Sequence, residues 1–149
     1  MTLLERLGGR EAITRGIVHT FRILSRRPRP SRHEEAAGEE LDAYLRGLGL
    51  SPVRDGAGNR MADVPPAPGR ASAPRLILQG HLDMVCVSDS GVDHDFTRDP
   101  LELVVEDGFV KARGTTLGGD NGIAVAMAMA VLADNTLVHP PIVAVFTTD

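Results

Sequence analysis

An α/β fold, with a mixed sheet flanked by helices, is what this 149-residue sequence predicts. Segments with the apolar period of a helix alternate with short apolar runs that suit strands. Two of those runs, 75–79 and 142–146, are nearly continuous, which is typical of strands buried on both faces of a helix-covered sheet. The length is about that of one domain, so a single core is expected.

Two helices are expected before the first strand. Residues 11–26 repeat apolar side chains at helical spacing and stop in RRPRP, where two prolines prevent continuation. Ser31 is followed three residues later by Glu34, which fits a capping box. The box predicts that a second helix begins there and ends at Gly49.

The middle of the chain predicts short strands and loops. Residues 50–63 contain two strands around DGAGN, a turn rich in residues that tolerate positive φ, and PPAPGRASAP is expected to be a loop. After the strand 75–79 and an irregular polar stretch, residues 101–112 predict a hairpin whose turn is Asp107-Gly108. A helix of small residues, 123–132, precedes the last strand.

The apolar run 142–146 is followed only by TTD. Because termini usually lie at the surface, a central strand so close to the last residue predicts that residues 1–149 are a piece cut from a longer domain. The neighbouring strands of 142–146, and some covering helices, are then expected from sequence beyond Asp149. Such a piece should be marginally stable and prone to associate. The alternative is an edge strand at a true C-terminus.

Composition and charge exclude several classes of function. The chain is 42% apolar and 24% charged with a net charge of −4, and without a basic excess no nucleic-acid partner is expected. Cys86 is the only cysteine, so no intrachain disulfide can form, and a reducing cytoplasm is the simplest compartment. The longest apolar run, 123–133, is too short for a bilayer, so no membrane partner is expected.

Three polar clusters follow strands or open a helix, where ligands collect in open α/β sheets. His81 and Asp83 follow the strand 75–79, Asp120 opens the small-residue helix, and residues 147–149 follow the last strand. His81 and Asp83 are two residues apart, so they face the same way on an extended backbone. Imidazole and carboxylate together suit Zn²⁺, Mn²⁺ or Co²⁺. The alternative is a polar loop that makes only local hydrogen bonds.

The glycine-rich stretch LGGDNG also fits a phosphate cradle at a helix N-terminus. It lacks the Lys-Ser/Thr of a P-loop and the spacing of a dinucleotide fingerprint. Asp120 would place a carboxylate where the anion should bind, so the stretch suits a cation better than a phosphate. An alternative role for Asp120 is that of a first-turn acid stabilised by the helix dipole.

The motifs GHLDMV, HDF, GTTLGGDNGIAVA, HPP and FTTD, in this order and spacing, resemble the aminoacyl-histidine dipeptidase (peptidase D, Xaa-His dipeptidase) family of co-catalytic dizinc metallopeptidases. The segment RPRPSRHEEA also resembles the RPSGHE-type segment of that family, with Arg32 where a glycine or another small residue is more usual. The resemblance covers nearly the whole chain.

This resemblance implies a role for each matching residue. His81 would bind one of two divalent ions, zinc in the first place with cobalt or manganese as alternatives, and Asp120 would bridge both ions. Asp83 would be the catalytic-site residue that holds the imidazole in the correct tautomer. The family pattern continues with two glutamates, a general base and a metal ligand, beyond Asp149. The isolated 149 residues, as the N-terminal part of the catalytic domain, are therefore expected to be inactive and to bind metal weakly.

The resemblance further implies hydrolysis of dipeptides or short peptides by a cytoplasmic homodimer, with a lid and dimerisation domain and a C-terminal half outside residues 1–149. A C-terminal histidine in the substrate is implied by the resemblance alone. The alternative function is a non-catalytic metal-binding or interaction module. The remaining histidines are expected not to be ligands, and Cys86 is expected to be an inert thiol: His19, His33, His94 and His139.

Overall fold

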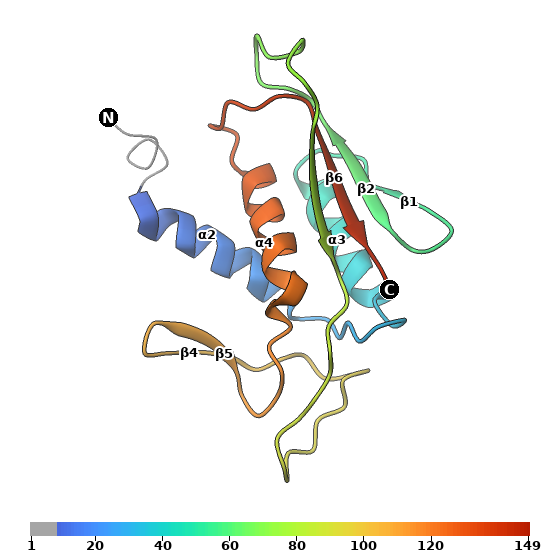
Figure 1. The fold of residues 1–149 in the computed structure, drawn as a ribbon, viewed down its shortest axis with the longest axis vertical. Coiled ribbons are helices and arrows are strands. Elements are labelled where there is room, and N and C mark those ends of the chain that lie inside the picture. The colour runs from blue at the N-terminus through green and yellow to red at the C-terminus, as the bar shows by residue number, and fades with distance from the viewer. Residues whose placement is uncertain (1–8) are drawn as a thin grey trace.

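The computed structural model describes residues 9–149 and confirms the α/β class (Figure 1). Three helices, a four-stranded mixed sheet and a separate two-stranded hairpin make up the described fold. The elements run in the order α2 (Gly9–Leu24), α3 (Glu35–Gly47), β1 (Val53–Arg54), β2 (Arg60–Val64), β3 (Leu76–His81), β4 (Leu103–Glu106), β5 (Phe109–Ala112), α4 (Gly119–Ala133) and β6 (Ile142–Thr147).

The main sheet has the strand order β1-β2-β6-β3. Strand β6 is antiparallel to β2 and parallel to β3, and α4 lies in the crossover between β3 and β6. Val143, for example, pairs with Asp63 on one side and with Ile77 on the other. The prediction that the neighbours of β6 come from beyond Asp149 is therefore wrong, because an apolar run shows that a strand is central without showing which strands flank it.

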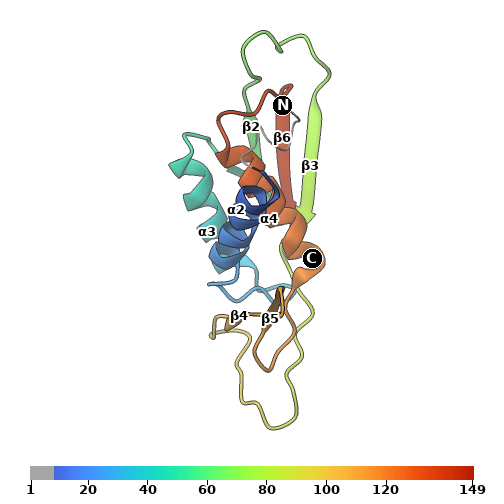
Figure 2. The same cartoon turned by 90° about the vertical axis from the view of Figure 1, so that its left-hand side faces the viewer.

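All three helices lie on one side of the sheet (Figure 2). Residues of β6 alternate accordingly: Ile142, Ala144 and Phe146 are buried toward the helices, whereas the residues between them are only partly buried. On the other face, Ile77 of β3 is 64% exposed. Burial of both faces stays a prediction, because some of the covering helices are expected from sequence beyond Asp149, and within residues 9–149 the second face is open. Apolar residues on both faces of β6 hide, in the sequence, the two-residue period that the packing imposes.

One apolar core joins the sheet to the helices. At its centre α4 crosses β3 so closely that a Cβ added to Gly80 would lie 3.0 Å from Val125 Cγ2 and 3.1 Å from its backbone nitrogen. The glycine thus sets how near α4 approaches the end of β3. The buried core residues are Leu24, Ala37, Leu41, Leu45, Ala62, Leu82, Val125, Ala128, Met129, Ala144 and Phe146.

The predicted elements agree with the structure apart from some of their ends. The β4–β5 hairpin turns at Asp107 and Gly108, whose φ values of 53° and 79° match the predicted turn residues. The small-residue helix begins earlier than predicted, at Gly119, and Asp120 and Asn121 in its first turn have non-helical backbone angles. None of the helices in residues 9–149 is long and apolar enough to cross a membrane.

Candidate metal centre

His81 is the last residue of β3, and its imidazole is held by the carboxylate two residues on. The Nδ1 atom of His81 lies 2.9 Å from Asp83 Oδ1. Between them Leu82 is fully buried in the core, and its backbone N–H donates to the Thr147 carbonyl over 2.7 Å. The carboxyl ends of β3 and β6 therefore lie side by side, and the turn after β3 is fixed by burial and by the sheet.

Asp120 reaches the other ring nitrogen of His81 from the start of α4. Its Oδ1 lies 3.4 Å from His81 Nε2, although the two residues are far apart in the sequence. Gly118, with a φ of 65°, supplies the left-handed turn that precedes the helix. The Asp120 side chain is 99% exposed, so the carboxylate stands in solvent beside a partly exposed imidazole.

This geometry fits a metal ion better than a hydrogen bond. The 3.4 Å separation exceeds the usual N–H···O distance of about 2.9–3.0 Å. Two ligand atoms each about 2.1 Å from a tetrahedral zinc ion lie about 3.4 Å apart. Because an ionised carboxylate can only accept a hydrogen bond, the Nδ1 atom of His81 carries the proton and donates to Asp83, which leaves the Nε2 lone pair directed toward Asp120. His81 and Asp120 are thus arranged as two possible ligands of one ion.

A third protein ligand is not close at hand in the part of the chain that the structure covers. Within residues 9–149, no group of three histidine, cysteine, aspartate or glutamate side chains gathers closely enough to hold a metal. Asp149, after β6, makes an ion pair of 3.6 Å with Arg32 and donates its backbone N–H to Glu34 Oε1. The described residues therefore supply a pair of possible ligands.

Ser31 belongs to this site, which the sequence analysis missed. Its hydroxyl donates to Asp83 Oδ2 over 2.8 Å, so both oxygens of Asp83 are engaged. The predicted capping box is wrong: α3 begins at Glu35 without a side-chain cap, and Glu34 accepts the N–H of Arg32. Ser31 makes a tertiary contact instead, because a β-bridge between Pro30 and Met84 places this segment alongside the turn after β3.

Arg29 also approaches the site and was also missed, since RRPRP was interpreted as a helix stop and as part of a family segment without a role for this arginine. Its guanidinium is buried and donates to the carbonyls of Leu82 and Gly118, each over 2.8 Å. Burial lowers the pKa of Arg29 to about 10, which still leaves it protonated near neutral pH. The segment RPRPS that carries both residues was noted in the sequence, but its contacts span more than 50 positions.

The other residues singled out in the sequence make contacts away from His81 and Asp120. The His94 ring packs edge-on against Phe96 at 4.5 Å, and His139 Nδ1 lies 2.8 Å from the Pro140 carbonyl. Burial raises the pKa of the Cys86 thiol, which favours its neutral, unreactive form. Thr148 bonds to the β1–β2 turn through the side chain of Asn59 and the carbonyl of Ala57.

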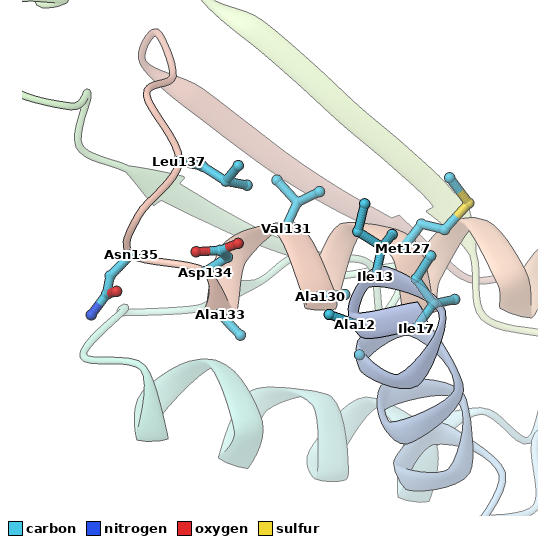
Figure 3. Close-up of a pocket in the computed structure, with 11 residues that line it drawn as sticks. Ala12, Ile13, Ile17, Met127, Ala130, Val131, Ala133, Asp134, Asn135 and Leu137 are labelled. Atoms are coloured by element: carbon cyan, nitrogen blue, oxygen red, sulfur yellow. The ribbon is translucent and has the colours of Figure 1, made fainter. Parts of the chain in front are cut away.

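A cavity of about 470 Å³ lies between α2 and α4, apart from His81 and Asp120 (Figure 3). Apolar side chains from the two helices, among them Ile13, Ile17 and Met127, lie together along it. Its polar side chains are Asp134 and Asn135, at the end of α4. The cavity shares no residue with the candidate site, and its lining provides no group of three polar ligands.

Comparison with known proteins extends the observations on fold and site. No family model matches the chain. Cytosol non-specific dipeptidase of Escherichia coli (strain K12) is 42% identical over 120 residues, which cover 80% of this chain and 25% of that protein. The crystal structure of aminoacylhistidine dipeptidase from Vibrio alginolyticus has a TM-score of 0.87 and 36% identity, covering 94% of this chain and 28% of that one.

A more distant structure, the YXEP protein of Bacillus subtilis, is described as a dinuclear metal-binding peptidase of the M20 family. Its TM-score is 0.54 at 13% identity, covering 93% of this chain and 36% of that one, so the likeness concerns the fold. The chain spans about a quarter of the length of the two dipeptidases. The resemblance found in the sequence is confirmed: over that part, the chain is homologous to cytosol non-specific dipeptidase and to aminoacylhistidine dipeptidase.

Proposed function

We propose that residues 1–149 are the N-terminal part of the catalytic domain of a metal-dependent dipeptidase. His81 and Asp120 bind metal in this proposal, and Asp83 orients the imidazole. The observation that carries it is the placement of His81 between two carboxylates, with Asp83 at Nδ1 and Asp120 at Nε2. Homology to two dipeptidases supports the class of reaction.

Each side chain has a distinct task in this proposal. Asp83 accepts a hydrogen bond from Nδ1–H of His81 and so keeps the Nε2 lone pair available, while Ser31 fixes the carboxylate by donating to its second oxygen. Asp120 is the exposed ligand, and its two oxygens allow it to bridge two ions. The ions, when bound, polarise the scissile carbonyl and lower the pKa of an attacking water.

The cofactor is proposed to be a pair of divalent ions, with zinc favoured by the imidazole and carboxylate donors and cobalt or manganese also suited to them. The dinuclear metal binding of the M20 peptidase of similar fold supports the number of ions. The substrate is proposed to be a dipeptide or short peptide, with Xaa-His as the preferred type. A cytoplasmic homodimer with a separate lid domain is part of the same proposal, and the cytosolic E. coli relative supports the compartment.

Hydrolysis by the full-length protein tests this function. The purified protein should cleave a panel of dipeptides, lose the activity to a chelator and regain it with Zn²⁺, Co²⁺ or Mn²⁺. The Asp120→Asn variant should be inactive. The matched control is Asp63→Asn, which changes an 83% exposed carboxylate on β2 and should leave activity intact. Metal binding without hydrolysis of any peptide would instead favour the non-catalytic module.

Preference for Xaa-His is a separate result of the same panel. A kcat/KM for Xaa-His dipeptides well above that for matched dipeptides with other C-terminal residues would support it. Equal values would leave a dipeptidase of broad specificity and overturn only the substrate preference.

A further inference from the structure

Two segments must meet for the candidate centre to exist. The turn after β3 carries His81 and Asp83, and the turn before α4 carries Asp120. The sheet holds the first turn, and α4 holds the second. No hydrogen bond between His81 and Asp120 fixes their separation, and the Asp120 side chain is almost fully exposed. Something in the interior must therefore set the distance between the two turns.

Arg29 is bonded to both turns at once. Its Nη1 donates to the Leu82 carbonyl over 2.8 Å, and its Nη2 donates to the Gly118 carbonyl over 2.8 Å. Leu82 is next to His81 in the sequence, and Gly118 lies two residues before Asp120. Because the guanidinium is planar and rigid, these two bonds fix the two carbonyls relative to each other.

The charge of Arg29 is not neutralised by a direct ion pair within residues 9–149, and the field of the nearby Asp83 carboxylate only partly offsets the loss of solvation. Within residues 9–149, the ion pairs of the structure do not include this guanidinium, and its Nε is buried without a hydrogen-bond partner. The lowered pKa of Arg29, about 10, reflects this loss of solvation. A buried cation without a direct ion pair is costly to the fold, so Arg29 is a poor choice for stability alone.

The glycines around Asp120 leave room for this guanidinium. A Cβ added to Gly122 would lie 2.7 Å from Arg29 Nη2 and 3.1 Å from the Phe21 ring, and one added to Gly118 would collide with the same nitrogen. The glycine-rich stretch that resembles a phosphate cradle in the sequence is thus shaped around a buried arginine. Its glycines permit Arg29 to reach the turn that carries Asp120.

We propose that Arg29 is a positioning residue of the metal centre, whose guanidinium holds the His81 turn and the Asp120 turn at the separation that one ion can share. This inference rests on the proposed function, because it assumes that His81 and Asp120 bind metal. Arg29 touches neither side chain and acts through the backbone of both turns.

Cobalt binding to the full-length protein tests the proposal. The apoprotein is titrated with Co²⁺ and followed by visible absorption, which reports both the affinity and the coordination geometry of the ion. In Arg29→Lys, a single ammonium group replaces the two Nη groups of the guanidinium. It cannot hold the Leu82 and Gly118 carbonyls at the same fixed separation. We expect Co²⁺ affinity to fall by about 10-fold or more, the range measured for outer-shell partners of ligands, with an altered spectrum.

Arg60→Lys is the matched control. Arg60 is as buried as Arg29, but its bonds go to Asp42, Glu35 and Gly58, which lie outside both turns. We expect this control to lower the melting temperature and to leave Co²⁺ affinity and spectrum unchanged. An Arg29→Lys protein that binds Co²⁺ like the wild type, with the same spectrum, would overturn the positioning role while leaving the proposed function intact.

A second variant keeps the test decisive if Arg29→Lys does not fold. Gly122→Ala retains the arginine and adds a helix-favouring residue, but its Cβ displaces the guanidinium. We expect weaker Co²⁺ binding by this variant as well, and wild-type affinity would contradict the proposal. A wild-type protein without Co²⁺ affinity would overturn the proposed function and this inference together, an outcome distinct from the loss of the positioning role alone.

Discussion

Arg29 and Arg60 are equally buried, each 1% exposed, yet their surroundings differ. Arg60 lies among acidic groups, with Asp42 Oδ2 3.0 Å from its Nε and Glu35 Oε1 3.2 Å from its Nη2. Among residues 9–149, Arg29 donates hydrogen bonds to backbone carbonyls and to no side chain. One buried arginine is paired with charge, whereas the other is solvated by the peptide backbone.

The difference separates what stabilises the fold from what shapes the site. Arg60 joins the start of β2 to α3, and two carboxylates compensate its charge. Arg29 brings a buried charge without a direct ion pair to the two turns that carry His81 and Asp120. Substitution near Arg29 should therefore affect metal binding first, and substitution of Arg60 should affect stability first.

The largest effect on activity should follow the loss of a proposed metal ligand, Asp120 or His81, from the two turns that Arg29 contacts. In the full-length protein, Asp120→Ala should reduce kcat/KM by more than the about 10–100-fold that loss of an outer-shell partner costs. The melting temperature of the apoprotein should stay within the scatter of the wild type, because the side chain is almost fully exposed and makes no hydrogen bond to the described residues 9–149. Dipeptide hydrolysis and calorimetry measure the two quantities.

His81→Ala should give the same loss of activity and supplies an independent check. If either variant keeps wild-type activity and wild-type metal content, then the two turns do not form the metal centre. Arg29 would then have no role in metal binding that distinguishes it from Arg60.

Arg60→Met should have the next largest effect, on stability alone. It leaves the mostly buried Asp42 without its closest partner, and breaking such a pair costs about 3 kcal/mol. Urea unfolding of the full-length protein measures this loss. The kcat/KM of the folded variant should match the wild type, and a variant that is stable but inactive would show that Arg60, too, supports the site.

Ser31→Ala should have a moderate effect on the site. It removes the hydrogen bond to Asp83 Oδ2 and so loosens the carboxylate that orients His81. Metal affinity of the full-length protein should fall by about 10-fold, as for other outer-shell partners. Titration with Co²⁺ measures this fall. Ser31→Thr, which keeps the hydroxyl, should restore affinity.

Ser72→Ala, in the exposed loop before β3, is the matched control and should bind Co²⁺ as the wild type does. A Ser31→Ala protein with unchanged affinity would mean that the bond to His81 suffices to hold Asp83 in place.

The features that sequence predicted correctly are those set by local geometry. His81 and Asp83 lie on the same side because residues two apart on an extended chain do so, and Asp107-Gly108 forms its turn because both residues tolerate positive φ. Asp120 lies in the first turn of α4, as the glycines before the small-residue run predicted, and its role as a metal ligand stays a prediction. Local rules sufficed for these residues.

The features that sequence did not predict depend on distant contacts. Ser31 fits a capping box in the sequence, but its hydroxyl instead donates to Asp83, 52 positions away. Arg29 joins carbonyls 53 and 89 positions away, and no periodicity encodes such a pair. The partners of β6 were missed for the same reason. Pairing between remote segments decides these features, and the family resemblance gave only a general indication of it.

Arg32 is a third arginine to compare with Arg29 and Arg60, and its substitution is expected to have the smallest effect. Arg32, three residues from Arg29, has a φ of 70° in the left-handed region, at the position where the resembling family usually has glycine or another small residue. Its side chain is 85% exposed, and its ion pair with Asp149 at 3.6 Å is of the exposed kind that contributes little. Its charge therefore serves the fold less than that of either buried arginine.

Arg32→Gly should stabilise the full-length protein slightly. Glycine relieves a left-handed conformation that costs an arginine about 1 kcal/mol or more, but it adds flexibility to the unfolded chain, so a net gain of about 0.5 kcal/mol is expected. The backbone N–H that donates to Glu34 is retained. Arg70→Gly, in an exposed loop and outside the positive-φ set, should instead destabilise by a similar amount. Urea unfolding distinguishes the two, and equal losses in both variants would mean that Arg32 is held by contacts stronger than its backbone strain.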